Sequence, residues 1–300
     1  MAQDLQAVDR FTHHAMATLF EVMVGGHEEE YSGQAARAVF MEIDRIERLF
    51  NRFDPSSEIS RINRLEPGQK LAVGVETFEC LALAEEARRA TAGAFDINAR
   101  ALVKYKGRET PPSLDLVRTS RGFEARLPDA EAGGPSLLDL DLGGIGKGYA
   151  LDRVLEVLAD WSVENALIHG GTSTAIAIGT APGACDPKRG WPVGVGGKWL
   201  CPGIPDSFRL RGRALSGSGT EVKGTHVLDP RTGLPAGGHL AAWASHPAAA
   251  VADALSTAFM VMTTEDVAAY CERHPEVWAL VVKDYGDCRL FNGAVALECE

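Results

Sequence analysis

The sequence predicts an α+β fold in which strands pair mainly in antiparallel fashion. Segments with strand and helix patterns alternate irregularly along the 300 residues, whereas a doubly wound parallel sheet needs a regular alternation. Residues 165–179 hold two short apolar segments around a glycine turn, and residues 277–297 hold two more around Gly286. Strands joined by so few residues pair antiparallel. The length suits one large domain or two lobes that share a core.

In the first half of the chain, strand and helix patterns follow one another. Residues 17–24 are predicted to form a strand, and apolar residues recur at helical spacing over 31–50. A second helix is predicted at 76–91. The polar segment 106–136 is broken by proline and glycine and is expected to hold loops and weak strands. Apolar and acidic residues alternate over 138–142, which predicts a half-buried strand.

The second half begins with a glycine-rich turn, after which leucines and a valine at helical spacing predict a helix from Leu151 to Leu158. Two polar, glycine-rich regions, 180–206 and 216–238, are expected to be mostly loops. The remaining predicted elements are two strands within 165–179, a mostly apolar helix at 248–262, a short helix at 265–273, and two strands at 277–284 and 288–297.

Composition excludes several classes of function. The net charge is -11, from 30 basic and 41 acidic residues, which argues against a nucleic-acid groove and against docking on an anionic membrane. The N-terminal residues contain no apolar signal segment, and the longest apolar stretch, 248–262, is interrupted by Asp253 and too short to span a bilayer. We therefore expect a cytoplasmic protein without a transmembrane segment, unless a leader has been removed. The six cysteines contain no CxxC pair and are expected to be free thiols.

The stretch DLDLGGIGKGYALD, residues 139–152, has the composition of a phosphate-binding loop. A Walker A loop would need glycine at Asp141 and a hydroxyl at Gly148, and a dinucleotide fingerprint would need glycine at Tyr149. Both motifs fail. A turn through glycines into the start of a helix remains, and the free N–H groups there would attract an anion. The alternative is that these glycines only form a tight turn against the sheet.

The stretch ADALST, residues 252–257, places an acid within a nearly all-apolar helix. Asp253 and Thr257 are four residues apart and therefore lie on one face. A buried aspartate is costly unless it is paired or binds a cation. Carboxylate and hydroxyl oxygens are hard donors that suit Mg²⁺, which uses few protein ligands. The alternative is that Asp253 pairs with an arginine or caps a turn.

Two motifs contain a histidine that could serve catalysis. HGG at 169–171 is typical of esterase oxyanion loops, but neither Ser216 nor Ser218 has the flanking glycines of a nucleophile elbow. His226 precedes an apolar pair and a DPRTG turn. A lone histidine is more often structural. Beside a phosphate cradle and a Mg²⁺ site, however, it is suited to take a proton from an attacking hydroxyl.

Six motifs together carry a resemblance to a known family. In chain order they are MATLFEV (16–22), RFDPSSEISRIN (52–63), GAFDIN (93–98), DLGGIGKGYALDR (141–153), GTHVLDPRTGLP (224–235) and ADALSTAF (252–259). Their order and spacing resemble the ApbE family, the FAD:protein FMN transferases. The resemblance implies one ApbE-like domain over residues 1–300, with mixed and antiparallel sheets, packed helices and two lobes around a central cleft.

The resemblance also implies a reaction. Enzymes of this family bind FAD and Mg²⁺, and they transfer FMN to a threonine hydroxyl of a target protein, with a phosphoester formed and AMP released. Two other functions stay open: an FAD pyrophosphatase that gives FMN and AMP, and a non-catalytic FAD-binding protein. Relatives are often exported lipoproteins, whereas no leader is evident here.

The family's site residues can be carried over to this sequence. The resemblance places Mg²⁺ on the side chains of Asp253 and Thr257 and on the backbone carbonyls of Gly146 and Ser256, with His226 as the proton acceptor. No role is assigned to Lys147. The flavin nucleotide is expected to contact Met16, Phe53, Ala94, Phe95, Asp96, Gly143, Tyr149 and Leu228.

Overall fold

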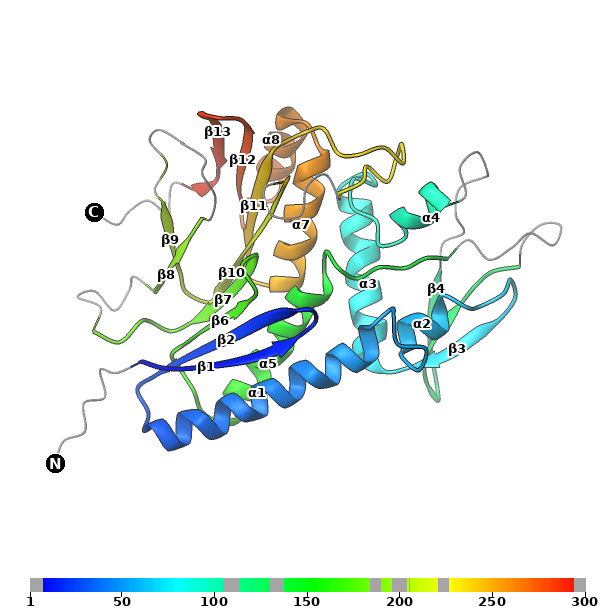
Figure 1. Ribbon diagram of the computed structural model, residues 1–300. Helices are drawn as coiled ribbons and strands as arrows, with labels where there is room; N and C mark the ends of the chain where they lie inside the picture. Colours follow the sequence, from blue (N-terminus) through cyan, green and yellow to red (C-terminus); the bar gives the residue numbers. More distant parts are fainter. Residues whose placement is uncertain are drawn as a thin grey trace.

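The structure is a computed structural model that describes residues 8–104, 114–129, 138–183, 190–195, 204, 206–220 and 227–293. An eight-stranded sheet runs through its centre (Figure 1), with neighbouring strands in the order β1-β2-β6-β7-β10-β11-β12-β13. Every neighbouring pair in this sheet is antiparallel, so the predicted α+β fold is confirmed. The strands are β1 (Val8–Ala15), β2 (Thr18–Gly25), β6 (Ala166–Gly170), β7 (Thr174–Ile178), β10 (Arg213–Gly219), β11 (Ala241–His246), β12 (Trp278–Asp284) and β13 (Asp287–Phe291).

Three helices cover one face of this sheet: α1 (Glu29–Phe50), α5 (Gly146–Asp160) and α7 (Ala249–Val261) (Figure 1). Their apolar stripes and the inward side chains of the strands form a common core, in which the largest members include Phe20, Ile43 and Ile168, all fully buried. Burial of each such side chain contributes about 1.5–3 kcal/mol before entropy is counted. The opposite face is covered by the hairpin of β8 (Trp191–Gly194) and β9 (Ser207–Leu210).

A second group of elements adjoins helix α7. It contains a three-stranded sheet with the order β3-β5-β4. One apolar core extends from this group into the main sheet, because Leu81 of α3 and Phe259 of α7 belong to the same cluster of buried residues. The elements are α2 (Glu58–Ile62), β3 (Lys70–Val73), α3 (Val75–Ala90), α4 (Ala99–Lys104), β4 (Asp115–Thr119) and β5 (Gly122–Arg126), and α8 (Thr264–Arg273) follows α7.

The long periodic segments were predicted well. The helices expected at 31–50, 76–91 and 248–262 are α1, α3 and α7, and the two predicted hairpins are β6–β7 and β12–β13. The glycine-rich region 216–238 was expected to be loop, but its first residues belong to β10, which lies in the middle of the main sheet.

The strand predicted at 138–142 is wrong, although its burial alternates as expected: Leu138, Leu140 and Leu142 are buried and the two aspartates are half-buried. No strand lies beside this segment in the described part of the chain. The Asp141 N–H donates to the Ile97 carbonyl at 2.8 Å, and side chains satisfy other backbone groups of the segment. The Asn63 amide oxygen accepts from the Leu140 N–H at 2.7 Å and its amide nitrogen donates to the Leu140 carbonyl at 3.1 Å.

The cysteines only partly match expectation. Cys80 and Cys271 are free and buried, whereas Cys288 is disulfide-bonded, so the prediction of free thiols is wrong for this residue. Cys185, Cys201 and Cys299 lie outside the described residues. None of the helices described here is long and apolar enough to cross a membrane.

Candidate functional site

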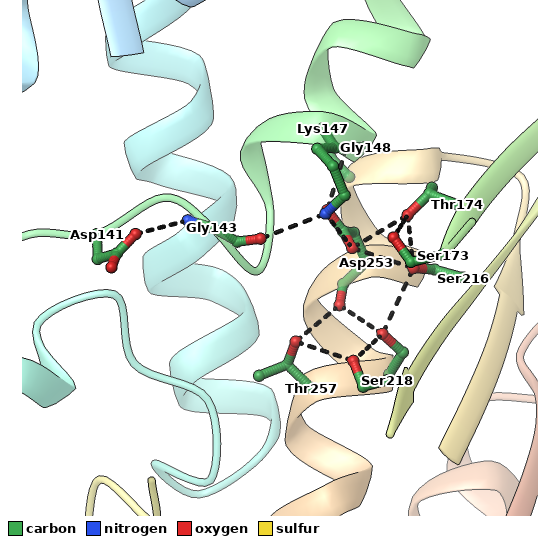
Figure 2. A network of polar contacts seen from close by, with 12 residues as sticks. Asp141, Gly143, Lys147, Gly148, Ser173, Thr174, Ser216, Ser218, Asp253 and Thr257 are labelled. Carbon is green, nitrogen blue, oxygen red and sulfur yellow. Dashed lines mark hydrogen bonds and ion pairs between the residues drawn. The ribbon is translucent and has the colours of Figure 1, made fainter. Parts of the chain in front are cut away.

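The predicted metal residue Asp253 lies on α7 with only 4% of its side chain exposed. Its Oδ1 accepts hydrogen bonds from the Ser216 hydroxyl at 3.0 Å and the Thr174 hydroxyl at 3.3 Å (Figure 2). Its Oδ2 accepts from the Gly148 backbone N–H at 3.2 Å and the Lys147 ammonium at 3.3 Å. A lysine, rather than the arginine considered from sequence, therefore compensates this buried charge.

Hydroxyl groups surround the carboxylate on its sheet side. Ser216 and Ser218 are two residues apart on β10 and so lie on one face of the strand. The Ser218 hydroxyl lies 3.0 Å from that of Ser256 and 3.5 Å from that of Thr257 (Figure 2). The Ser256 and Thr257 hydroxyls also donate to the Asp253 carbonyl, at 2.9 and 3.3 Å. The result is a continuous group of oxygen atoms between β10 and α7.

The glycine loop reaches this group because it lacks side chains. A Cβ on Gly144 would lie 3.0 Å from the Thr257 hydroxyl oxygen and 3.3 Å from the Phe95 ring. A Cβ on Gly148 would lie 2.2 Å from the Ala249 carbonyl oxygen, a separation that atoms cannot adopt. The two glycines thus permit backbone contact between the start of α5 and helix α7, which explains their presence better than a turn alone.

Arg52 anchors the other end of the loop. Its guanidinium donates to Asp141 at 2.8 Å and to Asp139 at 2.5 Å. The second Asp141 oxygen accepts from the Gly143 N–H at 2.9 Å, and the Gly143 carbonyl accepts from the Lys147 ammonium at 3.3 Å. Polar contacts therefore link Arg52 to Asp253 by way of Asp141, Gly143 and Lys147. Figure 2 shows the part from Asp141 to Asp253.

A second acid, Asp152, lies near the carboxylate of Asp253. Its two oxygens accept from the backbone N–H groups of Ala249 and Ala250, at 2.6 and 2.9 Å, and so cap the start of α7. Burial raises the pKa of Asp152 to about 6; the two N–H bonds oppose that shift and the charge of Asp253 adds to it. The site therefore holds two acids and one ammonium, an excess of negative charge that suits a cation.

The donor set fits a hard divalent cation. Asp253 and Thr257 supply a carboxylate and a hydroxyl one helical turn apart, beside a loop rich in backbone carbonyls. Within the described residues, no three His, Cys, Asp or Glu side chains gather as a metal cage. Mg²⁺ takes few protein ligands and shares the rest with water and phosphate. Gly146 is the buried first residue of α5, and its N–H donates to the Leu142 carbonyl at 2.7 Å.

Some residues expected to contact flavin lie next to the loop. Ala94 and Phe95 are 1% and 3% exposed, and burial raises the pKa of the neighbouring Asp96. Gly143 is exposed. Tyr149 is 3% exposed, and its hydroxyl donates to Glu79 at 2.8 Å, so this side chain serves the packing of α5 on α3.

The other expected flavin contacts come from three separate turns. Met16 occupies the β1–β2 turn with a positive φ of 48° and packs against the core. Phe53 is 85% exposed, and the guanidinium of Arg52 lies over its ring, 5.4 Å from the centroid. Leu228 forms an isolated bridge with Pro235. His226, the expected proton acceptor, lies outside the described residues.

Sequence reasoning missed four residues of the site: Lys147, Thr174, Ser216 and Ser218. The serines were considered only as hydrolase nucleophiles. Their spacing of two residues could have indicated a shared site, because side chains at alternate positions of a strand point to the same face of the sheet. Nothing local to Thr174 or Lys147 indicates their pairing with Asp253, which lies 79 and 106 residues away.

Comparison with known proteins gives the same family throughout. The ApbE family model matches residues 16–281. A relative from Chlamydia muridarum called FAD:protein FMN transferase is 26% identical over 271 residues, covering 78% of each chain. A relative of that name from Klebsiella pneumoniae is 28% identical over 221 residues, covering 67% of this chain and 66% of its own.

Solved structures share the fold. The ApbE protein of Thermotoga maritima superposes with a TM-score of 0.78 at 24% identity, covering 98% of this chain and 100% of its own. The apo flavinyl transferase ApbE of Pseudomonas stutzeri gives a TM-score of 0.76 at 21% identity and covers 98% of each chain. The family match extends from the β1–β2 turn to β12 and so includes the glycine loop and Asp253. The chain belongs to the ApbE family.

Proposed function

We propose that this chain is a Mg²⁺-dependent FAD:protein FMN transferase. It would transfer FMN from FAD to a threonine hydroxyl of a target protein, with a phosphoester formed and AMP released. Family membership supports this proposal, as do the names of relatives that align over most of the chain. The reaction exchanges one phosphate linkage for another, so it requires positioned phosphate, charge compensation and a proton acceptor.

The observation that carries the proposal is the buried carboxylate of Asp253. It lies one turn before Thr257 on α7 and contacts the glycine loop through the Gly148 N–H and Lys147. We assign the metal to the Asp253 and Thr257 side chains, with the carbonyls of Gly146 and Ser256. When bound, Mg²⁺ would offset negative charge on the pyrophosphate oxygens.

The chain's own residues would do the rest. We assign the phosphates to the exposed loop at Gly143, which leads into the start of α5, because the N-terminus of a helix favours negative charge. The flavin is assigned to Met16, Phe53, Ala94, Phe95, Asp96, Gly143, Tyr149 and Leu228. For Tyr149, contact with the flavin requires the hydroxyl to leave its hydrogen bond with Glu79. His226 is assigned as the group that accepts the threonine proton, since imidazole titrates near neutral pH.

One experiment separates the candidate functions. The protein is mixed with FAD, Mg²⁺ and a threonine-bearing acceptor protein, with its Thr→Val variant as the matched control. Flavin fluorescence in a denaturing gel detects covalent transfer, and chromatography measures AMP. We expect a fluorescent acceptor band that requires Mg²⁺ and the threonine, with AMP released in equal amount.

Other outcomes would favour the other functions. Equal amounts of free FMN and AMP, with no flavin on the acceptor, would indicate an FAD pyrophosphatase. FAD binding without Mg²⁺-dependent AMP release would indicate a flavin-binding protein. Either result, obtained with a competent acceptor present, would contradict the proposed transfer.

A further inference from the structure

Lys147 is the most exposed side chain that contacts the Asp253 carboxylate. Its ammonium lies 3.3 and 3.5 Å from the two carboxylate oxygens and 3.3 Å from the Gly143 carbonyl. These distances exceed those of ordinary N–H···O hydrogen bonds, which are about 2.7–3.2 Å. The lysine side chain is 19% exposed against 4% for the aspartate. The ammonium therefore lies on the solvent side of a carboxylate that is otherwise enclosed.

The carboxylate has little room for another ligand while Lys147 stays. Ser216 and Thr174 bind Oδ1, and the Gly148 N–H binds Oδ2. A carboxylate offers about four lone-pair sites, and these three donors plus the ammonium use them. The hydroxyls of Ser216 and Thr174 are buried and also contact each other at 2.9 Å, so they are fixed. A metal ion that binds Asp253 has to displace the ammonium.

Charge determines when that displacement is favourable. The negative charge of Asp253 and the positive charge of Lys147 balance each other in the observed ion pair. Adding a divalent cation while the ammonium remains nearby makes the site positive, and the two cations repel each other. A bound pyrophosphate reverses this balance, because it offers the released ammonium a new anionic partner.

We propose that Lys147 is a resident counter-ion of Asp253 that opposes metal binding until a pyrophosphate is present. The same side chain then changes partner from the aspartate to phosphate. Metal and nucleotide would thus bind cooperatively, with Lys147 as the coupling residue. That the phosphate partner is a nucleotide rests on the proposed function. The competition between the Lys147 ammonium and a metal ion for Asp253 rests on the geometry alone.

The test is metal affinity in the absence of nucleotide. Mn²⁺ serves as the probe, and electron paramagnetic resonance measures its free concentration. We expect Lys147→Gln to bind Mn²⁺ roughly tenfold tighter than the unmodified protein, within the usual range of coupling between sites. Lys147→Arg keeps the charge and should show no such gain. Lys70→Gln is the matched control, because Lys70 pairs with Glu124 on the smaller sheet; its Mn²⁺ affinity should be unchanged.

A second measurement distinguishes coupling from structural damage. ADP, which carries a pyrophosphate, is titrated calorimetrically at saturating Mn²⁺. Lys147→Gln should bind it several-fold more weakly, so the substitution shifts metal and nucleotide affinity in opposite directions. If the variant is too unstable to titrate, the rise of its unfolding midpoint with Mn²⁺ should exceed that of the unmodified protein.

Mn²⁺ affinity that stays the same or falls in Lys147→Gln would overturn the inference, as would weakening of both ligands together. These outcomes do not depend on catalysis. If the unmodified protein does not transfer FMN but Lys147→Gln still binds Mn²⁺ more tightly, only the proposed function is overturned.

Discussion

The Gly148 backbone N–H donates to the Asp253 carboxylate across 3.2 Å, at a point where no side chain separates helix α5 from helix α7. One hydrogen bond therefore joins the glycine loop to the helix that carries Thr257. Gly148 makes this contact possible because it has no side chain, since a Cβ there would meet the Ala249 carbonyl.

Gly148→Ala should destabilise the protein even though alanine favours helix. The helix preference would contribute about 1 kcal/mol, but overpacking against backbone costs about 1–3 kcal/mol or more. Thermal and chemical unfolding measure the difference. Gly146→Ala, two residues earlier in α5, is the control, because its Cβ would meet only side chains at 3.4 Å or beyond. Equal stability of the two variants would contradict the close helix contact.

Asp253→Asn should abolish metal binding while preserving most of the shape of the site. An amide is a neutral and weaker ligand for Mg²⁺ than a carboxylate, so we expect Mn²⁺ affinity to fall by about a hundredfold or more and FMN transfer to fall below detection. Thr257→Val should weaken Mn²⁺ binding less. Thr119→Val on β4 is the control for the loss of a hydroxyl. An Asp253→Asn protein that transfers FMN at the original rate would refute the metal assignment.

Asp152 should make stability depend on pH in a defined window. Burial raises its folded pKa from 3.8 to about 6, so the folded state holds the proton more tightly than the unfolded chain. The contribution to stability is fully present below about pH 4 and is lost as the pH rises through 6. Asp152→Asn should reduce the slope of unfolding free energy against pH between these values. An unchanged slope in urea titrations would show that this carboxyl does not titrate there.

Asn63 should be essential to the extended segment before the glycine loop. Asn63→Ala leaves both polar groups of Leu140 without these partners, and we expect a loss of about 2 kcal/mol. Gln69→Ala, which removes a polar contact with Glu66 at the surface, should cost about 0.5 kcal/mol or less. Urea unfolding of both variants gives the comparison. A similar small loss in both would mean that water replaces the asparagine at no cost.

The successes and failures of sequence prediction have local causes. Helix α1 was predictable because one stripe of the 22-residue helix is buried and the other residues are exposed or half-buried. Strand β10, with the sequence RALSGSG, has almost no strand propensity. It becomes a strand because β7 and β11 pair with it on both sides. A Cβ on Gly217 would lie 2.5 Å from the Trp243 indole nitrogen, so close packing determines the residue there.

The residues of the site likewise divide into those that the sequence identified and those that it did not. Asp253 and Thr257 stood out because polar residues one turn apart in an apolar helix require an explanation. Lys147 stands out as a charged residue in a glycine-rich loop, yet its partner Asp253 lies on another helix, 106 residues later. Pairing across such a separation depends on the crossing of α5 and α7, and no local pattern encodes that crossing. Sequence thus identified the acid but not the ammonium that neutralises it.

The strand order of the main sheet also has a consequence for biosynthesis. Each strand of this sheet after β1 lies next to one made earlier, so the sheet can grow at one edge as the chain leaves the ribosome, and none of these strands must wait for a later one to find its first neighbour. Asp253 arrives only after β11, when most of the chain has been synthesised. A nascent chain therefore has much of its sheet well before the buried carboxylate of Asp253 can meet Lys147 and the glycine loop.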